Sequence, residues 1–170
     1  HLLFVVGLMI IVRSTRSLIK TVTAFTVAHS ITLALATLGY ASVPTNPLNA
    51  AIALSILFLG VGVVRLWQGQ TSFTLRHPWI VAFAFGLLHG FGFASGLTTV
   101  GLPSGDIPLA LLAFNVGVEI GQLAFVLIAL LLKRALRILQ INLPVWAHYV
   151  PGYLVGSLGA FWTIERTLPL

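Results

Sequence analysis

The sequence predicts an all-α membrane protein, a single transmembrane domain over residues 1–170 that forms a bundle of about six helices. Three observations predict it: 58% of the residues are hydrophobic, only 7% are charged, and the mean hydropathy is +1.06. Soluble domains carry about 25% charged residues, and a chain with far fewer cannot cover a water-exposed surface. The absence of cysteine excludes a disulfide framework and a thiolate metal site.

Hydrophobic runs separated by prolines and charged residues define the elements. Pro47, Pro78 and Pro108 directly precede three of the runs, where a missing backbone donor costs nothing. A helix needs about 20 residues to cross a bilayer, so the first run is too short, and the chain is expected to be a fragment whose upstream residues complete that helix. The predicted spans are residues 1–12 (truncated), 21–39, 48–67, 79–98, 109–132 and 146–164.

The basic residues predict the orientation. The net charge of +6 is compatible with nucleic acid, but the basic side chains lie in short stretches at the ends of the runs, which favours a membrane surface. The connections 40–47 and 99–108 contain none. Because Lys and Arg prefer the cytoplasmic side, both ends of the chain are expected outside, in a multi-pass protein of the bacterial inner membrane. The basic residues near the connections between spans are Arg13, Arg16, Lys20, Arg65, Arg76, Lys133, Arg134 and Arg137.

Small residues are typical of helix contacts in lipid, where association relies on close packing. Glycines recur in the last three runs, and we expect them to mark packing rather than chemistry. They are Gly86, Gly90, Gly92 and Gly96, then Gly117 and Gly121, then Gly152, Gly156 and Gly159.

Four ionisable residues are expected near the middle of the membrane. His29, His89 and Glu119 fall near the middle of their runs, and His1 lies twelve residues, roughly 18 Å, before Arg13. An ionisable group at the bilayer centre costs about 2.5–3.5 kcal/mol or more, which makes each a functional candidate. Imidazole binds Ni, Zn, Cu or Fe(II), and one carboxylate lowers the charge of a bound ion. We therefore predict a divalent-metal site formed by these four side chains at one depth. Supporting polar side chains are expected from Asn115 and Gln122, about one turn from Glu119, and from Ser30 beside His29.

Alternatives remain open. Each histidine taken alone, or a protonated Glu119, is equally compatible with a hydrogen bond between helices. The same residues would also serve an intramembrane hydrolase, with zinc on His1, His29 and His89 and with Glu119 as general base. A third possibility is a haem-binding or non-catalytic subunit of a larger membrane complex. We rank metal transport first and an enzymatic role below it.

Several stretches resemble the HupE/UreJ family of bacterial membrane proteins. They are His1-Leu-Leu-Phe, Phe25-Thr-Val-Ala-His29-Ser, Phe85-Gly-Leu-Leu-His89-Gly-Phe-Gly, Phe114-Asn-Val-Gly-Val-Glu119-Ile-Gly-Gln122 and Phe161-Trp-Thr-Ile-Glu-Arg166. The resemblance implies a polytopic inner-membrane protein linked to nickel or cobalt uptake, since relatives accompany nickel hydrogenase and urease systems. It also implies that His1 is the last residue of the family's Asp-His pair.

The partners expected are therefore a lipid bilayer and a divalent ion (nickel, cobalt or zinc). A second copy of the chain or a larger membrane complex is a further candidate partner. Nucleic acid is not expected.

Overall fold

In a computed structural model of the chain, every regular element among the described residues is a helix. The structure describes residues 1–12, 14–100, 106–140 and 144–168, and for residues 95 and 97–100 the backbone alone. The helices are α1 (Leu2–Ile11), α2 (Thr15–Thr37), α3 (Thr45–Trp67), α4 (Phe73–Arg76), α5 (Pro78–Val100), α6 (Ile107–Ile138), the short 3₁₀ helix η1 (Val145–His148) and α7 (Val150–Thr167).

Each predicted span corresponds to one helix, but several helices are longer than the apolar runs. α2 begins at Thr15 and α6 continues to Ile138, so both extend through basic residues. The reason is that a hydropathy window ends where charge begins, whereas a helix ends where its backbone hydrogen bonds end. Arg13 and the residues 101–105 of one predicted connection lie outside the described residues.

Within the described residues, three helices are long and apolar enough to cross a bilayer: α2, α3 and α6. Two shorter apolar helices accompany them, α1 and the part of α5 over Pro78–Ala94. The structure thus supports membrane-spanning helices, while the count of six spans and their orientation stay predictions.

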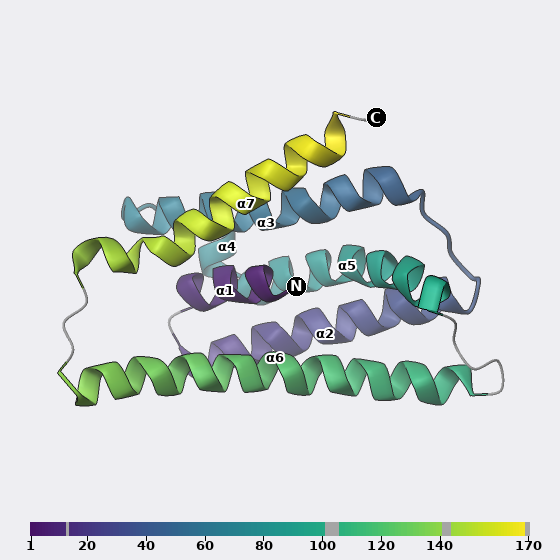
Figure 1. Cartoon of the computed structure of the whole chain (residues 1–170), viewed down its shortest axis with the longest axis horizontal. Coiled ribbons are helices and arrows are strands. Elements are labelled where there is room, and N and C mark those ends of the chain that lie inside the picture. Colours follow the sequence, from purple (N-terminus) through teal and green to yellow (C-terminus); the bar gives the residue numbers. More distant parts are fainter. Residues whose placement is uncertain (13, 101–105, 141–143, 169–170) are drawn as a thin grey trace.

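The long helices form two packed pairs, α2 with α5 and α3 with α7 (Figure 1). α1 lies between the pairs and contacts α3 and α7, and α6 runs along the outside against α2. The connections that follow α1, α3 and α6 share one end of the bundle, on the left of Figure 1, and the N-terminus lies near the middle of its length.

α1 forms the centre of the core. Phe4 and Leu8 are completely buried and pack with Phe25 of α2, Leu59 of α3 and Val155 of α7. A helix that contacts neighbours on most sides buries apolar residues all round, which explains why the sequence of α1 lacks a polar face.

Glycines allow α5 to approach α2 closely. A Cβ atom on Gly90 would collide with Thr32 and with the carbonyl oxygen of His29, and one on Gly86 would lie 2.9 Å from the Cβ atom of Ala28. The packing role predicted for these two glycines is therefore confirmed.

The α3–α7 pair uses the same device. A Cβ atom on Gly60 would lie 2.7 Å from the Cα atom of Gly156, and one on Gly159 would lie 2.6 Å from the backbone nitrogen of Leu57. On α6 the prediction is wrong, because a Cβ atom on Gly117 or Gly121 would meet no atom within 4 Å. These two glycines border a groove rather than a neighbouring helix.

Candidate metal-binding site

Three of the four predicted residues meet in the middle of the bundle. The ring centroid of His1 lies 4.6 Å from that of His89 and 5.2 Å from that of His29. His29 and His89 are completely buried. The three histidines belong to three separate parts of the chain: His1 directly precedes α1, His29 lies on α2 and His89 lies on α5.

The glycine contacts explain how α2 and α5 bring their histidines together. Gly90 follows His89 directly and faces the carbonyl oxygen of His29. With no side chain at position 90, the two backbones approach at the level of the histidines.

Phenyl rings surround the imidazoles. Phe93 lies 4.3 Å from His1 and 5.2 Å from His29, measured between ring centroids. Phe25 lies 5.5 Å from His1 and 5.3 Å from His89. Most of the wall is therefore apolar, which strengthens any electrostatic interaction inside it.

Ser55 of α3 sets the tautomer of His89. Its hydroxyl lies 2.6 Å from the carbonyl oxygen of Ile52 and 2.8 Å from Nε2 of His89. A hydroxyl has one proton, and the carbonyl oxygen can only accept it, so Oγ of Ser55 accepts in turn from Nε2–H of His89. The lone pair of His89 is then on Nδ1, which is the nitrogen available to a ligand.

Several buried nitrogens of the histidines have no hydrogen-bond partner in the part of the chain that the structure describes. They are Nε2 of His1, both ring nitrogens of His29 and Nδ1 of His89. Buried polar side-chain atoms in native proteins are mostly paired, so a concentration of unpaired ones calls for a specific explanation.

Glu119 is the fourth predicted residue, and the hydrogen bond described for it is not with the histidines. Its Oε1 accepts a hydrogen bond of 2.8 Å from the hydroxyl of Thr23 on α2. Thr23 precedes His29 by six residues, about 9 Å along the helix axis, toward the end where α2 begins. Among the residues that the structure describes, no three His, Asp or Glu side chains are arranged to hold one ion.

The predicted supporting residues bond to other partners than Glu119 or the histidines. Nδ2 of Asn115 donates to the backbone carbonyl oxygen of Leu111, and the hydroxyl of Ser30 donates to the backbone carbonyl oxygen of Thr26. Gln122 is 3% exposed, and its side-chain amide lies 3.1 Å from the hydroxyl oxygen of Thr26.

Two residues of the site, Ser55 and Thr23, were not predicted from the sequence. A usable signal existed for Ser55, because it is a single polar residue within the apolar run 50–60 and falls near the middle of α3. Thr23 had a weaker signal, since threonine often bonds back to its own helix.

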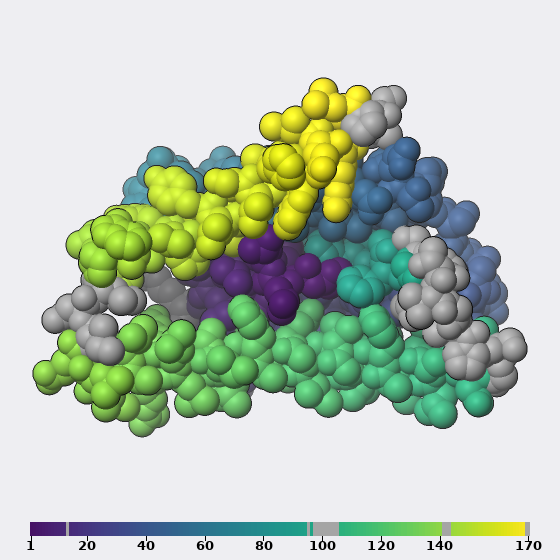
Figure 2. Space-filling view, in the orientation of Figure 1, coloured from purple at the N-terminus to yellow at the C-terminus, as the bar shows by residue number. Residues whose placement is uncertain are grey.

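A groove of about 450 Å³ opens beside His1, between α5 and α6. Its lining includes His1, Phe93, Gly117, Gly121 and Gln122. Figure 2 shows α1 at the bottom of a hollow bordered by α6 and α7.

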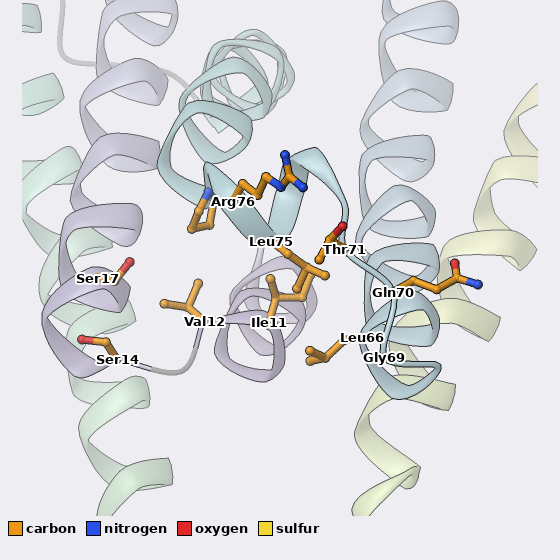
Figure 3. A pocket seen from close by; sticks show the side chains of 11 residues that line it. Ile11, Val12, Ser14, Ser17, Leu66, Gly69, Gln70, Thr71, Leu75 and Arg76 are labelled. Carbon is orange, nitrogen blue, oxygen red and sulfur yellow. The ribbon is translucent and has the colours of Figure 1, made fainter.

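A separate cavity of about 460 Å³ lies at the far end of α1, where Ile11 and Val12 meet α3 and α4 (Figure 3). Ser17, Gln70 and Arg76 also line it. This cavity is at the basic end of the bundle, away from the imidazoles.

The family model described as HupE / UreJ protein matches residues 1–166. This chain belongs to the HupE/UreJ family. No curated protein and no solved structure matches it significantly. The matched region of the HupE/UreJ chain includes the three clustered histidines, Glu119 and Gln122.

Proposed function

We propose that this HupE/UreJ protein carries a divalent transition-metal ion across the bacterial inner membrane, with nickel or cobalt as the cargo and zinc as a further candidate. The observation that supports it most is the meeting of His1, His29 and His89 at a buried place where four of their ring nitrogens have no hydrogen-bond partner among the described residues. Leaving a buried polar atom unpaired costs about 1–3 kcal/mol. Neutral imidazole is a preferred ligand of nickel and zinc, so an arriving ion would remove that cost.

The imidazoles must turn to share an ion. The ring planes of His1 and His89 are inclined by 78°, and those of His1 and His29 by 87°. His1 is only partly buried, whereas His29 and His89 are completely buried, so the ring of His1 has the most freedom to move. We infer that ion binding draws His1 toward His29 and His89, which are fixed by the α2–α5 contact.

Glu119 has a different place in the proposal. Its contact with Thr23 is nearer the basic end of the bundle than the imidazoles are. Under the positive-inside rule that end is cytoplasmic. A carboxylate on the inward side would attract an ion that leaves the imidazoles, and it would affect passage more than equilibrium binding.

The test is metal binding and uptake by the purified protein in proteoliposomes, compared for His29→Ala, His89→Ala and two control variants. The controls are His77→Ala and His148→Ala, because both of these histidines are exposed and lie outside the cluster. We expect each cluster variant to lose at least tenfold in nickel or cobalt affinity and the controls to match the wild type. Unchanged binding in both cluster variants would overturn the proposal.

The structure gives less support to a hydrolase. That function needs a carboxylate beside a metal-bound water. The described hydrogen bond of Glu119 is with Thr23, about 9 Å along α2 from His29. A non-catalytic role in a larger complex would leave the wild-type protein without metal affinity in the same experiment.

A further inference from the structure

Gln122 is the most deeply buried polar side chain described on α6. It is 3% exposed, whereas Asn115 and Glu119 on the same helix are only partly buried. Burying a polar amide without satisfying both of its ends is costly, so its surroundings indicate what it does.

The hydroxyl of Thr26 has two possible acceptors. Its Oγ1 lies 3.2 Å from the carbonyl oxygen of Val22 and 3.1 Å from Oε1 of Gln122. A single hydroxyl proton cannot form a full hydrogen bond to two oxygens. Threonine in a helix commonly donates to the carbonyl oxygen four residues earlier. A half-turn of the Gln122 amide removes this competition, because Nε2 then donates to Oγ1 of Thr26 while the Thr26 hydroxyl donates to the carbonyl oxygen of Val22.

That half-turn leaves the carbonyl oxygen of Gln122 as the free atom. After the half-turn, the oxygen takes the place of Nε2 of Gln122, which is buried and has no hydrogen-bond partner among the described residues. Nε2 of His1 is likewise buried and without a partner there. Gln122 and His1 line the same groove, whose walls are otherwise mostly apolar. Thr26, which holds the other end of the amide, precedes His29 by one turn of α2.

We propose that Gln122 is a ligand of the transported ion and supplies a neutral oxygen beside the imidazoles of His1, His29 and His89. This inference rests on the proposed function. Three imidazoles and one amide oxygen add no negative charge to the site, so they hold a divalent ion less tightly than a set with a carboxylate would. A transport site needs that balance, because an ion that enters must also leave.

The experiment compares cobalt(II) binding by the full chain in detergent, using calorimetry and the visible d–d absorption of the ion. We expect Gln122→Leu to lose at least tenfold in affinity and to change the cobalt spectrum. Gln122→Glu should bind more tightly, because a charged oxygen replaces a neutral one at the same position. A purely structural Gln122 would leave the spectrum of the bound ion unchanged.

Thr26→Val tests the orientation of the amide. It removes the hydroxyl that fixes Gln122, so we expect a loss of affinity smaller than that of Gln122→Leu. Thr21→Val is the matched control, because Thr21 is also buried on α2 and donates only to the carbonyl oxygen of Ser17.

The outcomes separate this inference from the proposed function. If the wild type binds cobalt and Gln122→Leu binds it within twofold with the same spectrum, the role of Gln122 is overturned and the imidazole site stands. If the wild type binds none, the proposed function fails first. Far-UV circular dichroism and size-exclusion chromatography of each variant show whether it is folded, and Gln122→Glu keeps the test decisive if Gln122→Leu is not.

Discussion

At the scale of single residues, Ser55 determines which nitrogen of His89 faces the site. The proton of Ser55 is committed to Ile52, so the hydroxyl can only accept from Nε2 of His89. Side chains that orient metal-binding histidines in this way typically affect metal affinity by about 10- to 100-fold.

We therefore expect Ser55→Ala to lower metal affinity by about 10- to 100-fold, because Nε2 of His89 loses its acceptor and the tautomer is no longer fixed. Isothermal titration of the purified variant with nickel measures the change. Ser157→Ala is the control, since Ser157 is exposed on α7. An affinity equal to that of the wild type in Ser55→Ala would show that the serine does not govern the ligand.

Glu119→Gln separates passage from binding. The amide keeps an oxygen that can accept from Thr23, so the contact between α2 and α6 should survive. We expect the equilibrium affinity to stay within about twofold while the initial rate of uptake into proteoliposomes falls several-fold. A parallel loss of both quantities would instead place Glu119 among the ligands.

The sequence identified the histidines but not their partners. Histidine in an apolar helix is conspicuous because its burial is costly, whereas serine and threonine satisfy themselves on their own helix and stand out little. Counting residues from the ends of the spans also placed Glu119 level with the histidines. The structure instead pairs Glu119 with Thr23, since depth depends on how each helix is shifted along its neighbours.

At the scale of helices, the approach of α5 to α2 depends on Gly90. We expect Gly90→Ala to destabilise the protein by roughly 1–3 kcal/mol, because the added methyl group would collide with Thr32 and the His29 carbonyl. It should also weaken metal binding by moving His89 away from His29. Thermal unfolding followed by fluorescence measures the first effect.

Gly121→Ala is the matched control for that substitution. A Cβ atom at position 121 would meet no atom within 4 Å, so the variant should unfold at the temperature of the wild type. Equal unfolding temperatures for Gly90→Ala and Gly121→Ala would contradict the role assigned to Gly90.

The helices themselves were largely predictable, because long apolar runs bounded by proline and charge admit few other structures in lipid. Which glycines pack against a helix was only partly predictable. The spacing of Gly117 and Gly121 equals that of Gly86 and Gly90, yet only the second pair meets a neighbouring helix. Spacing shows that a close approach is possible, and the partner decides whether it occurs.

At the scale of the whole molecule, the orientation in the membrane can be tested directly because the chain has no cysteine. We expect Tyr40→Cys to react with a membrane-impermeant maleimide from outside intact cells, and Gln70→Cys to react only after the membrane is opened. Both positions are exposed and lie at opposite ends of the bundle. The reverse labelling pattern would invert the predicted topology.

α6 is too long to lie wholly inside the hydrocarbon. Its 32 residues extend about 48 Å, against a core of about 30 Å. The last turns carry Lys133, Arg134 and Arg137, which are exposed. In the predicted orientation, these basic residues would lie at the charged headgroups of the inner leaflet.

In the proposed function, the central position of α1 links ion binding to the packing of the helices. His1 stands at the head of a helix that touches α3 and α7, while the other two histidines belong to the α2–α5 pair. A bound ion would therefore link the two halves of the bundle. Ion binding would also raise the melting temperature of the protein in proportion to the logarithm of the ion concentration. By the reciprocity of linked equilibria, any strain that pries the halves apart would also expel the ion.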